Sequence, residues 1–315
     1  MKIVILDSAT LGEDIDLSPI YGAGEVTEYK TTQPCEVAER IRSAEAIVVN
    51  KLKLGAHNLE NANALKLICV TATGYDNIDT EYCRSRGIAL CNVPAYSTDS
   101  VAEVTVAMAL SLVCRLNEYT AFVNSGAYSA SGVANRLTPV YREMSALTWG
   151  VVGGGAIGSR VAEIASVLGA KVLMCRRKPD SRYETAEVDS LCEKADIISL
   201  HVPLTDETRG LISRERIEKM KKDAILINSA RGAVTDEEAL ADAIEKGTLG
   251  GIGIDVYSTE PFGTDHPYTR ILGRSNVILT PHMAWGAAEA RARCVKIISE
   301  NIRSFIEQKM LNRIV

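Results

Sequence analysis

Three glycines in the middle of the chain have the spacing of a phosphate-binding turn. In WGVVGGGAIGSR (149–160), Gly153, Gly155 and Gly158 fit the pattern G-x-G-x-x-G. Apolar residues before the turn predict a strand, and the pattern after it predicts a helix. In such a turn the first glycine allows the bend, the second lets the backbone approach a pyrophosphate, and the third permits close helix–strand packing. A glycine-rich turn without a ligand is the structural alternative. The strand–turn–helix context favours dinucleotide binding by Gly153, Gly155, Ala156, Ile157 and Gly158.

Three polar side chains each follow a predicted strand in the second half of the chain. Arg231 follows the first in ILINSARG, Glu260 the second in GIDVYSTEP, and His282 the third in ILTPHMAW. The carboxyl ends of parallel strands meet at one sheet edge, so a guanidinium, a carboxylate and an imidazole can share one cleft. Each residue alone could be an ordinary surface or loop group. Together, and downstream of a dinucleotide turn, they favour a catalytic site.

The elements that must position these residues alternate between apolar, β-branched runs and helical patterns, which is typical of a parallel-sheet α/β protein. Strands are predicted at 3–6, 46–49, 67–70, 88–90, 148–152, 171–174, 197–200, 224–227, 250–255 and 277–279. Helices are predicted at 36–43, 80–86, 156–168, 214–220 and 236–245, with long helices at 100–119 and 287–308.

The position of the glycine turn divides the chain. A dinucleotide domain carries this turn after its first strand, yet four predicted strands precede it here, so those strands belong to another domain. The predicted fold class is α/β with two doubly wound parallel-sheet domains, a Rossmann nucleotide domain inserted into a flavodoxin-like substrate domain. Residues 1–98 and 286–315 form the substrate domain, and residues 99–285 form the nucleotide domain. The active site is expected in the cleft between them.

The composition narrows the class of protein. The chain has 315 residues, 46% hydrophobic and 24% charged, which is close to a globular average. A formal net charge of −5 argues against nucleic acid as an obligatory partner. No apolar run approaches a membrane span, and the N-terminus lacks a signal-peptide layout, so a cytoplasmic protein is expected. Eight scattered cysteines without a C-x-x-C pair predict free thiols and no metal site.

The residues resemble the D-isomer-specific 2-hydroxyacid dehydrogenase family over essentially the whole chain. Besides the glycine turn, the resemblance rests on ATGYDNID (72–79), NVPAYSTDSVAEVTVAMAL (92–110), LHVPLTDETRGLI (200–212), INSARGAVTDEEAL (227–240), GIDVYSTEP (253–261) and TPHMAW (280–285). NKLKL (50–54) and NVPAYSTDSVAE look most like the glycerate dehydrogenases, also called hydroxypyruvate reductases.

The resemblance implies a mechanism. Arg231 would bind the carboxylate of a 2-oxo acid as a bidentate pair, and the backbone N–H groups of Thr73 and Gly74 would hold it from the substrate domain. His282 would donate a proton to the carbonyl oxygen as a hydride reaches the carbon. Glu260 would pair with the other imidazole nitrogen, fix its tautomer and favour its protonated form.

The resemblance also implies further cofactor contacts, including an aspartate that faces the nicotinamide amide. These contacts are Thr105, His201, Val202, Pro203, Thr208, Ala230 and Asp255. For the two threonines, ordinary helix packing or capping is an equal alternative.

One position departs from the pattern of NAD-specific relatives. These carry an acidic residue about 20 residues after the turn, at the end of the second strand, to bind the ribose 2′-hydroxyl. Here Arg176 stands at that position, and Arg177 and Lys178 follow it. Two arginines and a lysine can bind a 2′-phosphate, so the predicted cofactor is NAD(P), with NADP modestly favoured over NAD. A solvated basic turn is the alternative, and Asp180 lies too far along the chain to be the first choice of a replacing acid.

The substrate and the assembly are less constrained. No arginine stands beside Gly74, where phosphoglycerate dehydrogenases carry basic residues, so a small 2-oxo acid such as hydroxypyruvate or glyoxylate is favoured. Tyr75, Tyr96 and Trp285 could instead admit a bulkier acid such as ketoisocaproate or phenylpyruvate. D-lactate dehydrogenase, phosphoglycerate dehydrogenase and a non-catalytic cofactor-sensing regulator remain alternatives. The resemblance also implies a homodimer, because relatives pair through the nucleotide domain with the helix 100–119 and the segment 123–141. This segment is polar and poorly periodic, which suits an arm that reaches a partner or a disordered loop.

Overall fold

The computed structural model describes residues 1–177 and 181–315 of the chain. Lys178 and Asp180, which enter the sequence argument above, lie outside the described residues. The chain forms two compact units, each with its own parallel sheet. The first unit combines Met1–Ser97 with Trp285–Val315, and the second is Thr98–Ala284.

The first unit contains five parallel strands in the order β2-β1-β3-β4-β5. They span Lys2–Ile5 (β1), Glu25–Glu28 (β2), Ala46–Val49 (β3), Leu67–Val70 (β4) and Ala89–Cys91 (β5). Its helices are α1 (Ser18–Tyr21), α2 (Val37–Arg40), α3 (Ala56–Leu59), α4 (Thr80–Arg86) and α12 (Ala288–Ile306), with short 3-10 turns at Ser8–Leu11 and Pro34–Glu36. Separate apolar clusters cover the two faces, one with α1 and α12 and the other with α2, α3 and α4. The strand order is the flavodoxin-like one.

The sequence patterns missed β2, and the structure gives the reason. Its sequence EVTE has no apolar run, and β2 lies at the edge of the sheet with its residues largely exposed. Burial, which produces the periodic apolar signal, is therefore weak in this strand. The strand predicted at 88–90 is observed one residue later, as β5.

The second unit contains seven parallel strands in the order β12-β11-β10-β9-β6-β7-β8. They span Thr148–Val152 (β6), Lys171–Cys175 (β7), Glu184–Thr185 (β8), Ile197–Leu200 (β9), Ile225–Asn228 (β10), Gly251–Ile254 (β11) and Val277–Leu279 (β12). This is the Rossmann order, with one further strand at the β12 edge. The order reverses between β6 and β9, which are hydrogen-bonded neighbours. In such sheets the crevice at the carboxyl ends of the two strands flanking the reversal is the usual ligand position.

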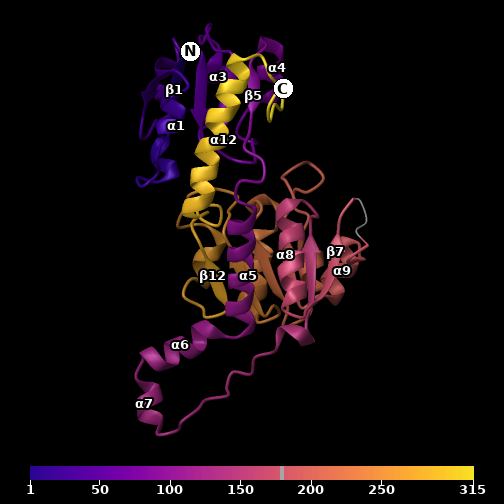
Figure 1. Ribbon diagram of the computed structural model, residues 1–315. Helices are drawn as coiled ribbons and strands as arrows, with labels where there is room; N and C mark the ends of the chain where they lie inside the picture. The colour runs from indigo at the N-terminus through magenta and orange to yellow at the C-terminus, as the bar shows by residue number, and fades with distance from the viewer. Residues whose placement is uncertain (178–180) are drawn as a thin grey trace. The chain divides into compact units, whose positions relative to one another are not determined.

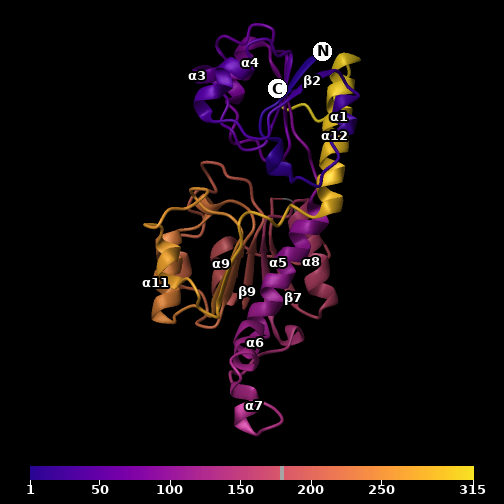
Figure 2. The ribbon, with the colours of Figure 1, turned by 90° about the vertical axis from the view of Figure 1, so that its left-hand side faces the viewer.

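Helices cover both faces of the second sheet (Figure 2). One face packs against α5 (Thr98–Val113) and α8 (Ala156–Val167), and the other packs against α9 (Val188–Lys194), α10 (Arg214–Glu218) and α11 (Glu237–Lys246). Short 3-10 turns lie at Met144–Ala146, Gly232–Val234 and Pro267–Ile271 (η5). Strands buried on both faces need continuous apolar runs, and this explains why β6, β9 and β10 were predictable.

The single helix predicted over 100–119 is two helices in the structure. The first, α5, ends at Val113, and α6 begins at Leu116 and ends at Asn124. Between them Arg115 adopts a left-handed backbone conformation with φ of 54°, which interrupts the α-helix. After α6 comes α7 (Ala127–Ser131), and the chain then returns without regular structure. Figure 1 shows α6, α7 and this returning segment standing away from the sheet of their own unit.

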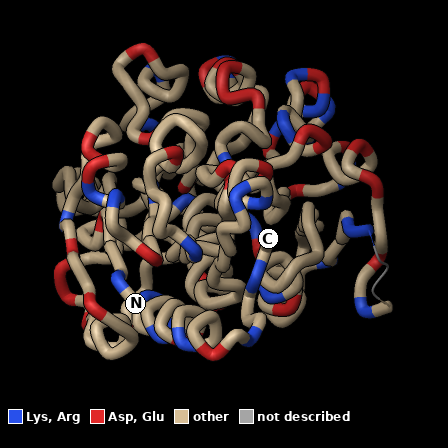
Figure 3. The backbone as a smooth tube through the Cα atoms, turned by 90° about the horizontal axis from the view of Figure 1, so that it is seen from above, with Lys and Arg blue, Asp and Glu red and all other residues tan. Residues whose placement is uncertain are grey.

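Acidic and basic residues are interspersed along the described chain (Figure 3). This mixture of signs agrees with the small net charge of −5. Within residues 1–177 and 181–315, no helix has both the length and the apolar character needed to cross a bilayer.

Candidate active site

The glycine turn joins β6 to α8 at the point where the strand order reverses. Gly153 has φ of 106°, a conformation that side chains disfavour, and a Cβ there would lie 2.5 Å from the carbonyl oxygen of His201, which follows β9. A Cβ on Gly158 would lie 1.8 Å from the carbonyl oxygen of Gly153. Two of the three motif glycines are therefore required by close backbone packing within the turn and against the β9 loop.

The middle glycine differs from the other two, because nothing lies near its missing side chain. A Cβ on Gly155 would meet no atom within 4 Å. Gly155 precedes α8, and Ala156 and Ile157 form its first turn, where backbone N–H groups have no helical acceptor. Open space over donor groups at a helix start fits the pyrophosphate of a dinucleotide. The residues present therefore fit this cofactor.

The loop after β9 lies against the turn. Burial lowers the pKa of His201 to about 3, so its imidazole is neutral at physiological pH, and its buried Nε2 atom has no hydrogen-bond partner among the described residues. Further along, the Thr208 hydroxyl donates to the carbonyl oxygen of Pro203 at 2.6 Å and accepts from the N–H of Thr205 at 2.8 Å. Thr208 thus shapes the loop that contains Val202, and its predicted cofactor contact remains a prediction.

Arg176 and Arg177, the two arginines that follow β7, make different contacts. The side chain of Arg176 crosses Gly154, since a Cβ on that glycine would lie 2.8 Å from both Cβ and Nε of the arginine. Arg177 is highly exposed and forms an ion pair of 3.0 Å with Glu207 of the β9 loop. Arg176 is therefore packed onto the predicted cofactor turn, whereas Arg177 is paired with the loop after β9.

The loop after β10 carries Arg231 and is held by a buried asparagine. The side-chain oxygen of Asn228 accepts from the N–H of Ala230 at 3.0 Å, and its amide donates to the carbonyl oxygen of Arg231 at 2.9 Å. Asn228 is fully buried at the end of the strand. These two hydrogen bonds close a short loop from residue 228 to residue 231. The backbone at Arg231 is therefore held by Asn228, the last residue of β10.

Gly232 brings the loops after β10 and β11 into contact. A Cβ at this position would lie 2.0 Å from the carbonyl carbon of Tyr257 and 2.1 Å from the backbone nitrogen of Ser258. Only a glycine allows two backbones to approach this closely. Because Arg231 precedes Gly232 and Glu260 follows Ser258 by two residues, the two predicted catalytic loops are packed directly against each other.

Glu260 and His282 form a hydrogen-bonded pair. The carboxylate Oε2 of Glu260 lies 2.7 Å from Nδ1 of His282, and the two side chains are 30% and 23% exposed. A carboxylate only accepts hydrogen bonds, so the proton of this pair is assigned to Nδ1 of the imidazole. The other carboxylate oxygen accepts from the N–H of Tyr257 at 3.1 Å. This is the geometry of an oriented general acid.

Tyr257 connects the Glu260 loop to the loop that carries His282. Besides its backbone bond to Glu260, its hydroxyl donates to the carbonyl oxygen of Thr280 at 2.9 Å. Burial, with added repulsion from Asp255 and Glu260, raises the pKa of Tyr257 to about 12. The phenol therefore stays protonated and keeps donating at any working pH.

Asp255 holds the backbone around His282 in an unusual conformation. His282 has φ of 52°, which is uncommon for a residue other than glycine. The buried carboxylate of Asp255 accepts from the Thr280 hydroxyl at 2.6 Å and from the backbone N–H groups of Met283 and Ala284 at 2.9 and 3.0 Å. Such strain persists where surrounding contacts fix it, and it is concentrated at functional sites. The predicted contact of Asp255 with the nicotinamide amide remains a prediction.

The remaining predicted binding residues are Thr105 in the second unit and Thr73 and Gly74 in the first unit. Thr105 is fully buried in α5, where its hydroxyl donates to the Val101 carbonyl and contacts Ser229 at 2.9 Å. Thr73 and Gly74 follow β4 in the first unit, and the Thr73 hydroxyl donates to the Val93 carbonyl at 2.8 Å. No group of three or more potential metal-ligating acids, histidines or cysteines occurs in the described parts of the chain.

The comparison with known proteins identifies the family. A model of the D-isomer-specific 2-hydroxyacid dehydrogenase NAD-binding domain matches residues 106–284, which contain the glycine turn and all three polar side chains of the candidate site. This chain belongs to the D-isomer-specific 2-hydroxyacid dehydrogenase family. It is therefore an oxidoreductase that uses a nicotinamide cofactor, as the sequence predicted.

Individual relatives cover the whole chain. It is 32% identical to a hydroxypyruvate reductase of Blautia hydrogenotrophica over 99% of both proteins. It is 34% identical to a glycerate dehydrogenase of Methylorubrum extorquens, over 99% of this chain and 98% of the relative. A solved acyclic imino acid reductase in complex with NADPH and D-Arg has a TM-score of 0.88 and 28% identity, with both chains fully covered. The predicted family and fold class are confirmed.

The sequence argument overlooked the residues that hold the site together. Asn228, Gly232 and Tyr257 make the contacts described above, and each lies inside a motif already quoted for the family resemblance. Of the three, only Gly232 gave a local signal, because a glycine immediately after a candidate catalytic arginine suggests close backbone approach.

Proposed function

We propose that this dehydrogenase reduces a small 2-oxo acid, hydroxypyruvate or glyoxylate, to the corresponding D-2-hydroxy acid. The pairing of His282 with Glu260 carries this proposal, because it supplies an oriented proton donor at the carboxyl edge of the nucleotide-binding sheet. Relatives with full coverage named hydroxypyruvate reductase and glycerate dehydrogenase add support for the substrate class.

In this mechanism the protein binds, orients and protonates. Arg231 grips the substrate carboxylate through its planar guanidinium. Nε2 of His282 donates its proton to the carbonyl oxygen, and the Glu260 carboxylate stabilises the imidazolium before the transfer. The nicotinamide, when bound, supplies the hydride. A positioned general acid of this kind contributes roughly 10²–10⁴-fold in rate.

We also propose that Thr73 and Gly74 bind the substrate carboxylate through their backbone N–H groups. In the described part of the chain neither N–H group donates to a protein acceptor. Asn92 fixes this turn by donating from its side-chain amide to the Thr73 carbonyl at 2.8 Å. Two adjacent, unused N–H groups on a fixed turn are suited to an anion.

A panel of 2-oxo acids tests the substrate assignment. We expect the highest kcat/KM with hydroxypyruvate or glyoxylate, and a product of D configuration. Higher kcat/KM with ketoisocaproate, phenylpyruvate or pyruvate would overturn the substrate assignment. Absence of turnover with every 2-oxo acid, under conditions where the cofactor binds, would overturn the reductase assignment itself.

For the cofactor, we infer that NADPH is used at least as well as NADH. Arg176 packs onto Gly154 of the glycine turn, where a carboxylate would exclude a 2′-phosphate. We expect Arg176→Asp to lower kcat/KM for NADPH by about tenfold or more, the loss of roughly one charge-assisted contact, and to spare NADH. Arg177→Asp, which makes the same charge change at the neighbouring arginine, measures whether this second predicted contact contributes to NADPH binding as well. A strong preference of the unmodified enzyme for NADH would refute the inference.

For the assembly, we infer a homodimer in which the segment 123–141 contacts the second subunit. Its apolar side chains are unusually exposed, with Leu137 at 73% and Val140 at 78%. Exposed apolar side chains clustered on one segment favour a protein interface. We expect Leu137→Asp with Val140→Asp to yield monomers by sedimentation, whereas Val167→Asp, at a site 88% exposed on α8, leaves the dimer intact. An unchanged sedimentation coefficient in the double variant would contradict the interface.

The cysteines support a location in the cytoplasm, which we also infer. All eight are free thiols in the structure, and five of them are buried. Unpaired thiols in this number favour a reducing compartment.

A further inference from the structure

A buried acid and histidine lie beside the site and have no part in the mechanism above. Glu237 is in the first turn of α11, and His266 precedes η5. Their side chains are only 10% and 7% exposed, and Oε2 of Glu237 lies 3.1 Å from Nε2 of His266. Nδ1 of the same histidine accepts from the N–H of Tyr268 at 3.2 Å, so the proton is assigned to Nε2 and donated to Glu237.

The same carboxylate also binds the other end of the loop that carries Glu260. Oε1 of Glu237 accepts from the N–H of Ser258 at 2.9 Å, and Oε2 accepts from the Ser258 hydroxyl. Ser258 lies two residues before Glu260, and His266 lies six residues after it. One buried carboxylate thus fastens both ends of a nine-residue loop, 258–266, to α11.

Aromatic packing fills the inside of this loop. The ring centroid of Phe262 lies 4.7 Å from that of Tyr257 and 4.8 Å from that of His266, and the latter two are 6.1 Å apart. The ring of Tyr268 packs against His266 at 4.9 Å and against Tyr257 at 6.2 Å. Burial, together with the charge of Glu237, raises the pKa of Tyr268 well above its usual value. His266 thus contacts all three of the other rings in this cluster.

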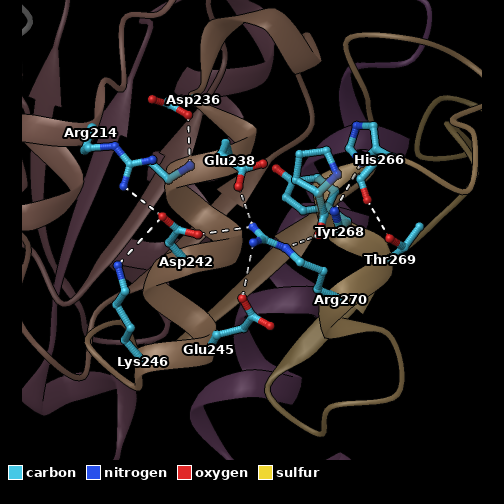
Figure 4. A network of polar contacts seen from close by, with 12 residues as sticks. Arg214, Asp236, Glu238, Asp242, Glu245, Lys246, His266, Tyr268, Thr269 and Arg270 are labelled. Atoms are coloured by element: carbon cyan, nitrogen blue, oxygen red, sulfur yellow. Dashed lines mark hydrogen bonds and ion pairs between the residues drawn. The ribbon is translucent and has the colours of Figure 1, made fainter.

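A second set of contacts fastens η5 to the outer face of α11 (Figure 4). The guanidinium of Arg270 lies 2.8 Å from Glu238, 3.1 Å from Asp242 and 3.6 Å from Glu245. Asp242 is also paired with Arg214 at 3.0 Å. These pairs are partly exposed, so each contributes little by itself, but together they anchor the segment that follows His266.

We propose that Glu237 is a positioning residue for the reduction, a clamp that sets the Glu260 carboxylate against His282. Rotation or shift of the loop 258–266 would lengthen the 2.7 Å contact between Glu260 and His282, because Glu260 lies inside this loop and the Tyr257 N–H that holds it immediately precedes the clamped Ser258. The proposal rests on the proposed function, in which that contact keeps the proton donor ready. Glu237 itself touches neither of the two reacting side chains and acts through the loop.

The test compares Glu237→Gln with Glu238→Gln in the full-length enzyme. Both substitutions remove one negative charge from the first turn of α11, but among the described residues the ion pair of Glu238 is with Arg270, away from the clamped loop. We expect Glu237→Gln to lower kcat by about tenfold with the cofactor Kd unchanged, and Glu238→Gln to change kcat by less than twofold.

The Glu260→Gln background separates positioning from general destabilisation. If Glu237 acts through Glu260, Glu237→Gln has little further effect on kcat in the Glu260→Gln enzyme. The same substitution still lowers thermal stability by an equal amount in the unmodified enzyme and in the Glu260→Gln enzyme. An equal loss of kcat in both backgrounds would overturn the proposal. Ser258→Ala removes only the hydroxyl contact, and if Glu237→Gln does not fold this milder variant takes its place, with an expected loss of about threefold.

A readout that needs no turnover keeps the clamp distinct from the proposed function. The chain has four histidines, so imidazole ¹⁵N resonances can be assigned by substitution. We expect Glu237→Gln to shift the His282 resonances toward those of Glu260→Gln, and unchanged His282 resonances would refute the clamp. If the unmodified enzyme reduces no 2-oxo acid while these resonances still move, the proposed function fails and the clamp stands.

Discussion

The glycine turn after β6 and the loops after β10, β11 and β12 lie along the carboxyl edge of one sheet but are built in different ways. In the turn, backbone atoms meet at distances that only glycines allow, and Gly155 leaves open space above the start of α8. In the loops, the side chains of Glu260 and His282 meet from two separate segments, and the backbone of the Arg231 loop packs against the Glu260 loop at Gly232. Further residues, among them Tyr257 and Asp255, hold these loops. A binding site made of backbone groups, such as the glycine turn, can therefore be contained in one local sequence motif. A site made of side chains, such as the Glu260–His282 pair, also requires supporting contacts from elsewhere in the chain.

The largest expected effect is a loss of stability that distinguishes Gly158 from Gly155, two glycines of the same turn. Gly158→Ala would place a methyl 1.8 Å from the Gly153 carbonyl oxygen, so we expect the free energy of unfolding to fall by about 3 kcal/mol. Gly155→Ala meets no atom within 4 Å, so it should leave stability unchanged and weaken cofactor binding instead. Thermal unfolding and cofactor titration of both variants measure the two effects. Equal losses of stability in Gly158→Ala and Gly155→Ala would contradict the assignment of Gly158 to backbone packing and of Gly155 to cofactor binding.

An acid-stability difference is expected at the β9 loop. The pKa of His201 is about 3 in the folded state against an ordinary 6.5, so between these values the unfolded chain binds a proton that the folded chain excludes. The stabilisation is complete above pH 6.5 and is lost as the pH falls, by up to about 1.4 kcal/mol per pH unit. His201→Gln should flatten urea-unfolding stability between pH 6.5 and 4.5, and His57→Gln, at an exposed site, should not. Identical slopes in all three proteins would contradict a buried neutral imidazole.

A smaller effect probes the side-chain site. Tyr257→Phe removes the hydroxyl that donates to the Thr280 carbonyl and leaves the ring in place. Such a hydrogen bond contributes about 1 kcal/mol, so we expect kcat to fall by roughly fivefold with little change in cofactor Kd. A change in cofactor Kd alone, with kcat preserved, would assign Tyr257 to the binding region instead.

The difference between the regions also explains what the sequence could predict. The glycine turn and the buried strands produce local patterns, so they were found in nearly correct places. Arg231, Glu260 and His282 were predicted because polar groups after consecutive parallel strands share an edge, and the structure pairs Glu260 with His282. Tyr257 and Glu237 gave no such signal, since their partners lie 23 and 21 residues away along the chain. The break in the predicted long helix was missed because arginine is not a residue type that favours the left-handed conformation that Arg115 adopts.

The paired imidazole at the centre of the site gives the most direct test. Replacing His282 with glutamine removes the proton donor but keeps a polar side chain of similar reach beside Glu260. The account predicts a loss of roughly 10²–10⁴-fold in kcat for 2-oxo acid reduction, with cofactor Kd within about twofold of the unmodified enzyme. Turnover close to that of the unmodified enzyme would contradict it.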